Sequence, residues 1–456
     1  NTLAGTDFSR EQLWKSVCAD TNEGRKNAEI MIETQKESLV QTAKIMRAGI
    51  DSVNPALRGS FCCVGYNAEF AYEIASVLAG KGNPIVVRIN NGNYTPAGAR
   101  YFSNVFFRAA AQIAKLKDKA DVILAETDTC PQNRYSTGAM SLHTHFTGTI
   151  LEGAKGAKHW ITRLSAFEPE SGTAYRKVLG KYSGFYQALA EIEPALNWRG
   201  FRIPVSDTPA FTFGKAWGGV AEKPSAWSMC VLERLGLPMY FSAQKGGVVC
   251  LEGETDARLS DEEIMEILKG PVFLASDTAQ RLIRRGFGPH LGVEVREWRG
   301  KQPSFEKLSV NGNAASVQMK VKELVPVSNA TLEDSVVYHS VDKVKLERLF
   351  PGTTIYKNTL GGTVFVFSGT PRADFNILEA FSFLTYSRKQ QLIKMHEQTE
   401  ELPVYYPNDE EVYLRAADTK DGGLFCAIFN ISLDPIEKLE LVCKRSVSKI
   451  EKLMPE

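Results

Sequence analysis

The sequence predicts an α/β protein with three successive regions, and two patterns along the chain lead to that prediction. Through the first 165 residues, short apolar segments of strand length alternate with longer segments whose apolar residues recur at helical spacing. This alternation is typical of βαβ units with a mostly parallel sheet. From about residue 403 apolar and polar residues alternate between turn residues, which is typical of antiparallel strands.

The first region begins with a long helical pattern over residues 23–48. Four strands and three intervening helices are then predicted, the strands at 60–65, 84–89, 121–125 and 157–162 and the helices at 68–79, 102–116 and 138–152. Four strands are half of an eight-stranded (β/α) TIM barrel, so we interpret them as strands five to eight, with the first half outside this sequence. An open doubly wound sheet is the alternative that four strands can form alone.

The second region follows a segment rich in Pro, Gly and aromatic residues at about 195–227. A second α/β pattern there indicates a smaller Rossmann-like domain, with a helix around 226–235, strands near 238–241, 247–251, 271–274 and 361–369, and a polar β insertion at 296–332. In its helix at 260–268, Ser260 and Glu263 have the spacing of a capping box. We predict domains at 1–195, 196–372 and 373–456, the last a helical linker with a C-terminal antiparallel β-sandwich.

Composition excludes several functional classes. Lys plus Arg (54) nearly balance Asp plus Glu (53), so no nucleic-acid partner is expected. The chain has no apolar run of about 18 residues and no signal-peptide pattern, so no membrane partner is expected either. The chain opens without Met, so a leader could have been lost, and we expect a cytoplasmic or periplasmic location. The eight cysteines include no CxxC spacing, so they are interpreted as mostly buried free thiols, without a metal site or cofactor.

The segment 121–139 (DVILAETDTCPQNRYSTGA) carries the main functional signal. An apolar strand ends there in Glu126, and a polar loop containing Pro131 follows. In a (β/α) barrel the carboxyl ends of the strands form the active site, so Glu126 can project into the barrel mouth. Asp128 would share its face only if the strand continued, and we expect the loop to begin there. A solvated carboxylate at a strand end is the alternative interpretation of Glu126.

Residues 124–164 resemble the nucleophile region of family 42 glycoside hydrolases, the bacterial β-galactosidases. The matching positions are Glu126, Pro131, the turn at 151–157 (LEGAKGA) and Trp160. The order of the later regions is also similar to that family, which places a class I amidotransferase-like α/β domain, associated with trimerisation, and a small β domain after the barrel.

The resemblance implies retaining hydrolysis of a β-galactoside or related glycoside, with Glu126 as the nucleophile. This mechanism needs a second carboxyl group about 5–5.5 Å away. The family places that acid/base after strand four, which lies outside this chain. Glu69 is an in-chain candidate, but we expect it in the first turn of a helix, where a carboxylate is favoured by the helix dipole alone.

Side chains expected to contact the sugar lie near the carboxyl ends of the same strands or in the segments that follow them. Amide, charged and aromatic groups bind sugar hydroxyls or stack on sugar faces, and the candidates are Arg88, Asn90, Arg134, Tyr135, His143 and Trp160. His143 and His145 would point about 200° apart on a helix, so they are not expected to bind one metal ion. Cys250 is expected to be a buried strand residue and not a nucleophile.

The leading expectation is a glycosidase in the complete protein. Its expected partners are a carbohydrate substrate and further copies of itself, as a trimer or dimer. The alternative is a non-catalytic carbohydrate-binding or scaffold protein that keeps the architecture.

Overall fold

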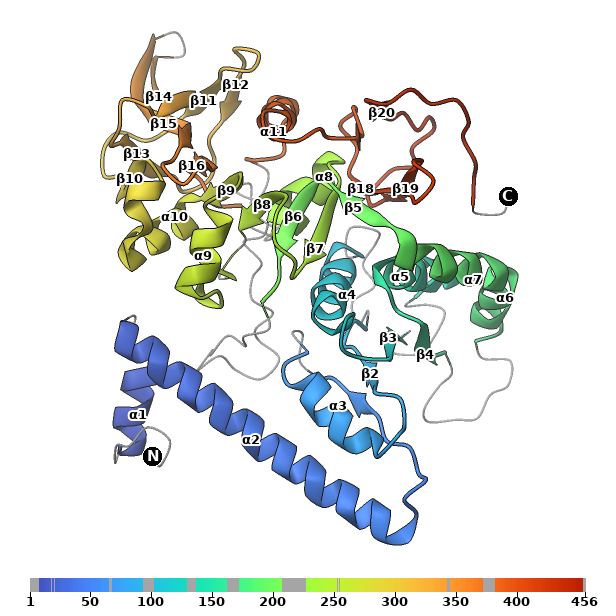
Figure 1. Cartoon of the computed structure of the whole chain (residues 1–456). Helices are drawn as coiled ribbons and strands as arrows, with labels where there is room; N and C mark the ends of the chain where they lie inside the picture. The colour runs from blue at the N-terminus through green and yellow to red at the C-terminus, as the bar shows by residue number, and fades with distance from the viewer. Residues whose placement is uncertain are drawn as a thin grey trace.

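The computed structural model shows a mixed α/β fold with a four-stranded parallel sheet and a nine-stranded mixed sheet (Figure 1). It describes residues 8–17, 19, 21–64, 68–92, 102–128, 137–161, 172–206, 227–251, 253, 255–342, 345–371 and 382–453. The predicted α/β class is confirmed. Within these ranges, the strands do not close into a barrel.

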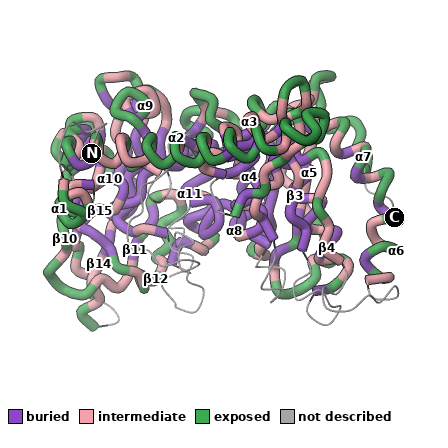
Figure 2. The backbone as a smooth tube through the Cα atoms, turned by 90° about the horizontal axis from the view of Figure 1, so that it is seen from below, coloured by how far each residue is buried: buried purple, intermediate pink, exposed green. Residues whose placement is uncertain are grey.

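Two helices precede the first sheet, α1 (Arg10–Val17) and α2 (Asn22–Val53). Helix α2 begins one residue before the predicted range, where the Thr21 side chain caps it by accepting a hydrogen bond from the Gly24 backbone N–H. It ends five residues after the predicted range. Much of α2 is exposed along its length (Figure 2). In the described part of the chain, no helix is both long and apolar enough to cross a bilayer.

The four-stranded sheet adds its strands in the order in which they occur along the chain. These strands are β1 (Phe61–Cys62), β2 (Val86–Arg88), β3 (Val122–Asp128) and β4 (Gly156–Trp160), and each is parallel to the next. The helices between them are α3 (Ala71–Ala79), α4 (Phe102–Leu116) and α5 (Ala139–Glu152). Strand β3 ends three residues later than predicted, so the expectation that a loop begins at Asp128 is wrong.

The two faces of this sheet differ in their packing. Val87, Ile123 and Ala125 belong to the main hydrophobic core, together with residues of α4 and α5. Because side chains alternate between the faces of a strand, Val122 and Leu124 lie on the opposite face. Both are half-buried and lie outside the described hydrophobic clusters. The described core of this region therefore lies on one face of the sheet.

The nine-stranded sheet has a parallel part and an antiparallel part. Its parallel strands lie in the order β7-β6-β8-β9-β16, and they are β6 (Phe201–Pro204), β7 (Met239–Ser242), β8 (Val248–Leu251), β9 (Val272–Ala275) and β16 (Thr363–Phe367). Antiparallel strands extend it from β16, in the order β15 (Lys345–Lys357), β14 (Leu332–Asp342), β11 (Phe305–Leu308) and β12 (Ala314–Ser316). The parallel strands are almost continuously apolar, as strands covered on both faces are.

The remaining elements of the second region border this sheet. They are α8 (Glu233–Leu235), α9 (Asp261–Ile267), α10 (Ser276–Leu282) and the antiparallel pair β10 (Val293–Glu297) and β13 (Lys322–Pro326). The predicted capping box is confirmed, because Ser260 Oγ accepts from the Glu263 amide at 3.2 Å and Glu263 Oε2 accepts from the Ser260 amide at 2.7 Å. Cys250 is fully buried in β8, as predicted. The cysteines of the described residues are free thiols.

The last region is antiparallel, as predicted, but one of its strands comes from elsewhere in the chain. After α6 (Thr173–Lys181) and α7 (Ser183–Ile192), β5 (Asn197–Arg199) pairs with β18 (Val412–Asp418) in a sheet of order β19-β18-β5. The other elements are α11 (Tyr386–Glu397), β19 (Leu424–Asn430) and the pair β17 (Val404–Tyr405) and β20 (Val442–Cys443). Strand β5 falls within the predicted second domain and pairs with the predicted third.

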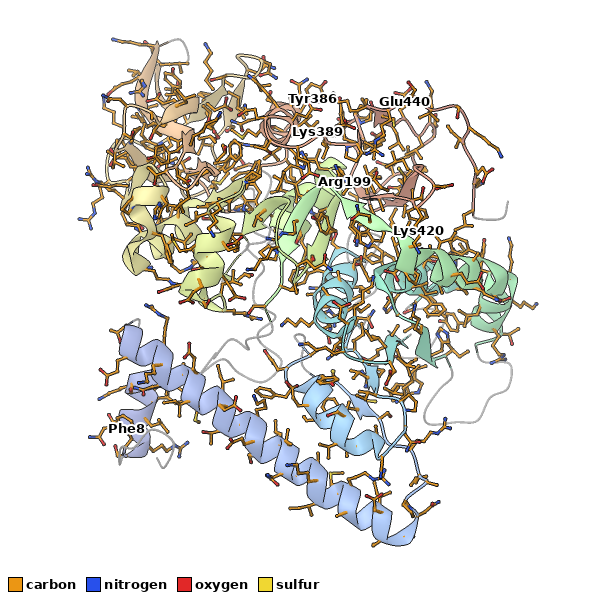
Figure 3. The ribbon with its side chains drawn as sticks, viewed as in Figure 1. Phe8, Arg199, Tyr386, Lys389, Lys420 and Glu440 are labelled. Atoms are coloured by element: carbon orange, nitrogen blue, oxygen red, sulfur yellow. The ribbon has the colours of Figure 1, made fainter. Side chains whose placement is uncertain are left out.

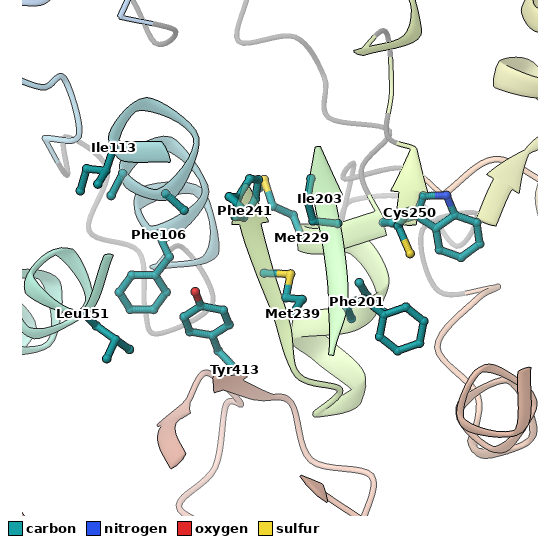
Figure 4. Packing of buried hydrophobic residues seen from close by; sticks show 14 of the residues in the cluster. Phe106, Ile113, Leu151, Phe201, Ile203, Met229, Met239, Phe241, Cys250 and Tyr413 are labelled. Carbon is teal, nitrogen blue, oxygen red and sulfur yellow. The ribbon is translucent and has the colours of Figure 1, made fainter. Parts of the chain in front are cut away.

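Contacts from β5 and α4 join the three regions. Arg199 of β5, which is labelled in Figure 3, forms ion pairs with Glu400 at 3.0 Å and Asp418 at 3.6 Å. Phe106 of α4 stacks on Tyr413 of β18, with ring centroids 4.9 Å apart, as the close-up of the core shows (Figure 4). The neighbouring Phe107 meets Phe241 of β7 edge-on at 5.6 Å. Helix α4 therefore contacts the four-stranded, the nine-stranded and the three-stranded sheet.

Candidate functional site

Glu126 lies near the carboxyl end of β3, and its carboxylate is paired with Arg88 of β2. Arg88 Nη1 lies 2.6 Å from Glu126 Oε2, and the two side chains are 13% and 11% exposed. Arg88 is in register with Leu124, so both charged groups project from the half-buried face of the sheet. The structure thus brings together two of the predicted site residues.

The Arg88 guanidinium is also held by backbone oxygens. Its Nη1 donates to the carbonyl oxygens of Cys63 at 3.3 Å and Ile89 at 3.4 Å. These bonds hold the guanidinium between the ends of β1 and β2. They therefore keep the Arg88 side chain in one rotamer next to Glu126. The sequence predicts that Arg88 contacts the substrate, whereas its observed contact is with the expected nucleophile.

A layer of buried polar side chains contacts the backbone of Glu126. The Glu126 amide donates to Asn91 Oδ1 at 2.8 Å. Asn91 Nδ2 contacts Thr149 Oγ1 at 2.9 Å and His145 Nε2 at 3.1 Å. These three side chains are at most 1% exposed. The layer therefore connects the segment after β2, the end of β3 and helix α5.

His145 in this layer is uncharged at neutral pH. Burial lowers the pKa of His145 to about 3, the positive charge of Arg108 acts in the same direction, and a hydrogen bond to the Asn91 backbone opposes both. A neutral imidazole keeps one nitrogen without a proton, which can accept a hydrogen bond. The sequence analysis excluded a shared metal ion for His143 and His145, and it selected neither His145 nor Asn91 for the site.

Asn90 is placed by polar side chains of α4. The backbone N–H of Asn90 donates to Gln112 Oε1 at 3.1 Å, and the backbone carbonyl oxygen of Asn90 accepts from Gln112 Nε2 at 2.8 Å. Arg108 Nη2 donates to the Gly92 carbonyl oxygen at 2.6 Å. The Asn90 side chain donates to the carbonyl oxygen of Val64. Residues 90–92 are therefore held at the carboxyl end of β2 by Gln112 and Arg108 of α4 and by the Val64 carbonyl oxygen.

His143 does not join this group. Its ring stacks on Tyr182 with centroids 4.0 Å apart, and Nδ1 lies 2.8 Å from the Tyr186 hydroxyl. Burial lowers the pKa of His143, with a smaller contribution from Lys181, and burial raises the pKa of Tyr186. His143 is thus a neutral member of an aromatic cluster between α5 and α7.

Strand β4 places two further side chains beside Glu126 and Asp128. Lys158 is in register with Glu126, and Trp160 is in register with Asp128. Lys158 Nζ lies 5.4 Å from the centre of the Trp160 ring. Because β3 continues to its end at Asp128, alternation places Asp128 on the face of Glu126, where it is 2% exposed. Trp160 is therefore at the same sheet face as the predicted nucleophile.

The other sequence candidates lie elsewhere. Arg134 and Tyr135 fall outside the described residues. Glu69 lies in the turn before α3 and not within the helix. In the described part of the chain, no three His, Cys, Asp or Glu side chains are grouped so as to hold a metal ion. A comparison of the sequence with protein-family models and with curated proteins found no match.

Proposed function

We propose that this chain belongs to a retaining glycoside hydrolase acting on a β-galactoside or related glycoside, with Glu126 as the nucleophile. The observation that carries the proposal is the Glu126 carboxylate at the carboxyl end of a parallel strand, held at 2.6 Å by Arg88 on the sheet face away from the core. A carboxylate in this place is positioned as barrel active-site residues are.

The strand order supports a half-barrel as the setting of Glu126. Each of the four strands is added beside the preceding one, in one direction, with a helix between. A doubly wound sheet instead reverses its strand order at a switch point and carries helices on both faces. The one-sided core under β2 and β3 agrees with a barrel wall, whose other face lines the barrel interior. In the same proposal, the second region is an amidotransferase-like domain that joins copies of the chain, and the last region forms a β-sandwich.

The proposed chemistry has two steps. One Glu126 oxygen forms a bond to the anomeric carbon while the bond from that carbon to the leaving oxygen breaks, and the leaving oxygen takes a proton from the acid/base residue. Water, deprotonated by the same residue, then releases the sugar and regenerates Glu126. Arg88 fixes the rotamer of the nucleophile, and Asn90 and Trp160 are proposed to bind the sugar. No residue of this chain is assigned as the acid/base.

An activated, fluorinated substrate tests the nucleophile without the acid/base residue. The dinitrophenolate of 2,4-dinitrophenyl 2-deoxy-2-fluoro-β-galactoside leaves without being protonated, and fluorine slows release of the glycosyl-enzyme. We expect the intact mass to increase by one fluoroglycosyl group, located at Glu126 by peptide sequencing. Glu126→Gln should not be labelled, whereas Glu73→Gln on α3 should be labelled like the wild type. An unlabelled wild type, or a label on another residue, contradicts the proposal.

The same ion pair favours a second candidate function. A carboxylate already engaged by an arginine can serve only to join two strands, as it would in a carbohydrate-binding or scaffold protein that does not hydrolyse its ligand. Calorimetry with a panel of oligosaccharides, combined with labelling of the same sample by the activated fluorogalactoside, separates the two functions. Binding without labelling of Glu126 supports the scaffold, and labelling of Glu126 excludes it.

A further inference from the structure

The side-chain amide of Asn91 has one orientation that satisfies all its neighbours. The peptide N–H of Glu126 can only donate, so the atom 2.8 Å from it must be the Asn91 oxygen. The Asn91 nitrogen then faces Thr149 Oγ1 at 2.9 Å and His145 Nε2 at 3.1 Å. Both must accept, which requires His145 to carry no proton on Nε2.

The hydroxyl of Thr149 completes this assignment. Its proton is donated to the backbone oxygen of His145, one turn earlier in α5, at 2.9 Å. Its lone pairs therefore remain to accept from Asn91 Nδ2. Each group in the series of hydrogen bonds that runs from the Glu126 peptide to helix α5 consequently has a defined role as donor or acceptor.

We propose that Asn91 is a positioning residue for the nucleophile, with its amide oriented by His145 and Thr149 so that it fixes the peptide of Glu126. This inference rests on the proposed glycosidase function. The Glu126 side chain is held by Arg88 on one face of β3, and its peptide is held by Asn91 in the plane of the sheet. Two independent constraints thus define where the attacking oxygen lies.

The burial of this layer makes its orientation costly to change. Asn91, His145 and Thr149 are at most 1% exposed, so water cannot replace a lost partner at low cost. Removing the Thr149 hydroxyl leaves one Asn91 proton without its acceptor, and the amide can then rotate. Displacement of a reacting group by about 1 Å can reduce a rate on the order of 100-fold, so a partial displacement is expected to cost about tenfold.

The test measures how fast the dinitrophenyl fluorogalactoside labels Glu126 in the full-length chain. Thr149→Val and His145→Leu remove one acceptor each, and we expect about a tenfold lower limiting labelling rate with little change in the half-saturating concentration. Thr149→Ser restores the hydroxyl and should recover most of the rate. Thr144→Val is the matched control, because Thr144 lies on the same helix and donates to the backbone oxygen of Met140 at 3.0 Å on its exposed side. Its labelling rate should equal that of the wild type.

The outcomes separate the inference from the function on which it rests. If the wild type is labelled at Glu126 and Thr149→Val labels at the same limiting rate, the positioning role is wrong while the function stands. If Thr149→Ser is as slow as Thr149→Val, packing and not the hydroxyl is responsible, and the inference fails. A wild type that is not labelled overturns the proposed function, and the positioning role with it.

Discussion

Two carboxylate–arginine pairs, one on strand β3 and one at the end of helix α5, differ in their surroundings. Glu126 and Arg88 lie on the half-buried face of a sheet, and their side chains are 11% and 13% exposed. Glu152, the last residue of α5, pairs with Arg415 of β18, and these side chains are 6% and 1% exposed. The Tyr413 hydroxyl donates to Glu152 Oε1 at 3.1 Å, and the Arg415 guanidinium lies 4.2 Å from the centre of the Trp198 ring.

This difference indicates which of the two pairs is accessible enough to take part in catalysis. Glu152 is surrounded by Arg415 and Tyr413 and joins two distant segments of the chain, so its role is to hold the C-terminal sheet on the first region. Glu126 joins neighbouring strands and lies on the sheet face outside the described core. A carboxylate used only for stability is expected to resemble the first case and a reactive one the second.

Breaking the buried pair should have the largest effect. Removal of one partner leaves an uncompensated charge in the core, so Arg415→Met is expected to lower the free energy of unfolding by about 3–5 kcal/mol. Urea unfolding followed by circular dichroism measures this. Arg445→Met is the control, because Arg445 pairs with Asp418 at 2.6 Å with 36% of its side chain exposed, and its loss should cost less than about 1 kcal/mol. Similar losses for both variants would refute the distinction.

Acid should weaken the first site through His145. Because the pKa of His145 is lowered to about 3 in the folded chain, the unfolded chain binds an extra proton as the pH falls below about 6.5. The free energy of unfolding should therefore fall with decreasing pH and level off near pH 3. Relative to His145→Gln, the wild type is expected to lose about 2 kcal/mol between pH 7 and 4.5. A pH-independent difference between these two proteins would exclude the effect.

Removal of Arg88 should have a smaller effect on stability than removal of Arg415. Its pair with Glu126 is somewhat more exposed than the Glu152–Arg415 pair, so Arg88→Met is expected to cost less than Arg415→Met, on the order of 1–3 kcal/mol. A double-mutant cycle with Glu126→Gln, measured by urea unfolding, gives the coupling between the two side chains. A coupling as large as that between Glu152 and Arg415 would mean that the first pair is structural too, and would favour the scaffold function.

Local sequence patterns were sufficient to predict the elements whose boundaries are set within a few residues of the chain. The helix predicted at 102–116 is observed as Phe102–Leu116, and the Ser260 capping box fixes the start of α9. Strand β3 was predicted too short because Glu126, Thr127 and Asp128 are polar. Its end is set by pairing with β4, where Thr127 is in register with His159 and contacts its ring nitrogen.

The polar layer could not be predicted in the same way. Asn91 and His145 are 54 residues apart, and neither periodicity nor spacing relates them. Neither residue was among the candidates that the sequence indicated, and helical geometry showed only that His143 and His145 are unsuited to bind one metal ion. Strand β15 was not predicted either, but for a local reason. It contains Pro351 and Gly352, which weaken a strand pattern, while the register shifts between β14 and β15 accommodate them.

The pairing of Glu152 with Arg415 has a consequence for synthesis of the chain. The two residues are 263 positions apart, so at about 5–20 residues per second the ribosome adds Arg415 roughly 13 to 50 s after Glu152. During that interval the carboxylate at the end of α5 has no counter-charge from β18, and the edge of β5 is unpaired. The contact between the end of α5 and the C-terminal sheet can therefore form only after the last strands have been synthesised.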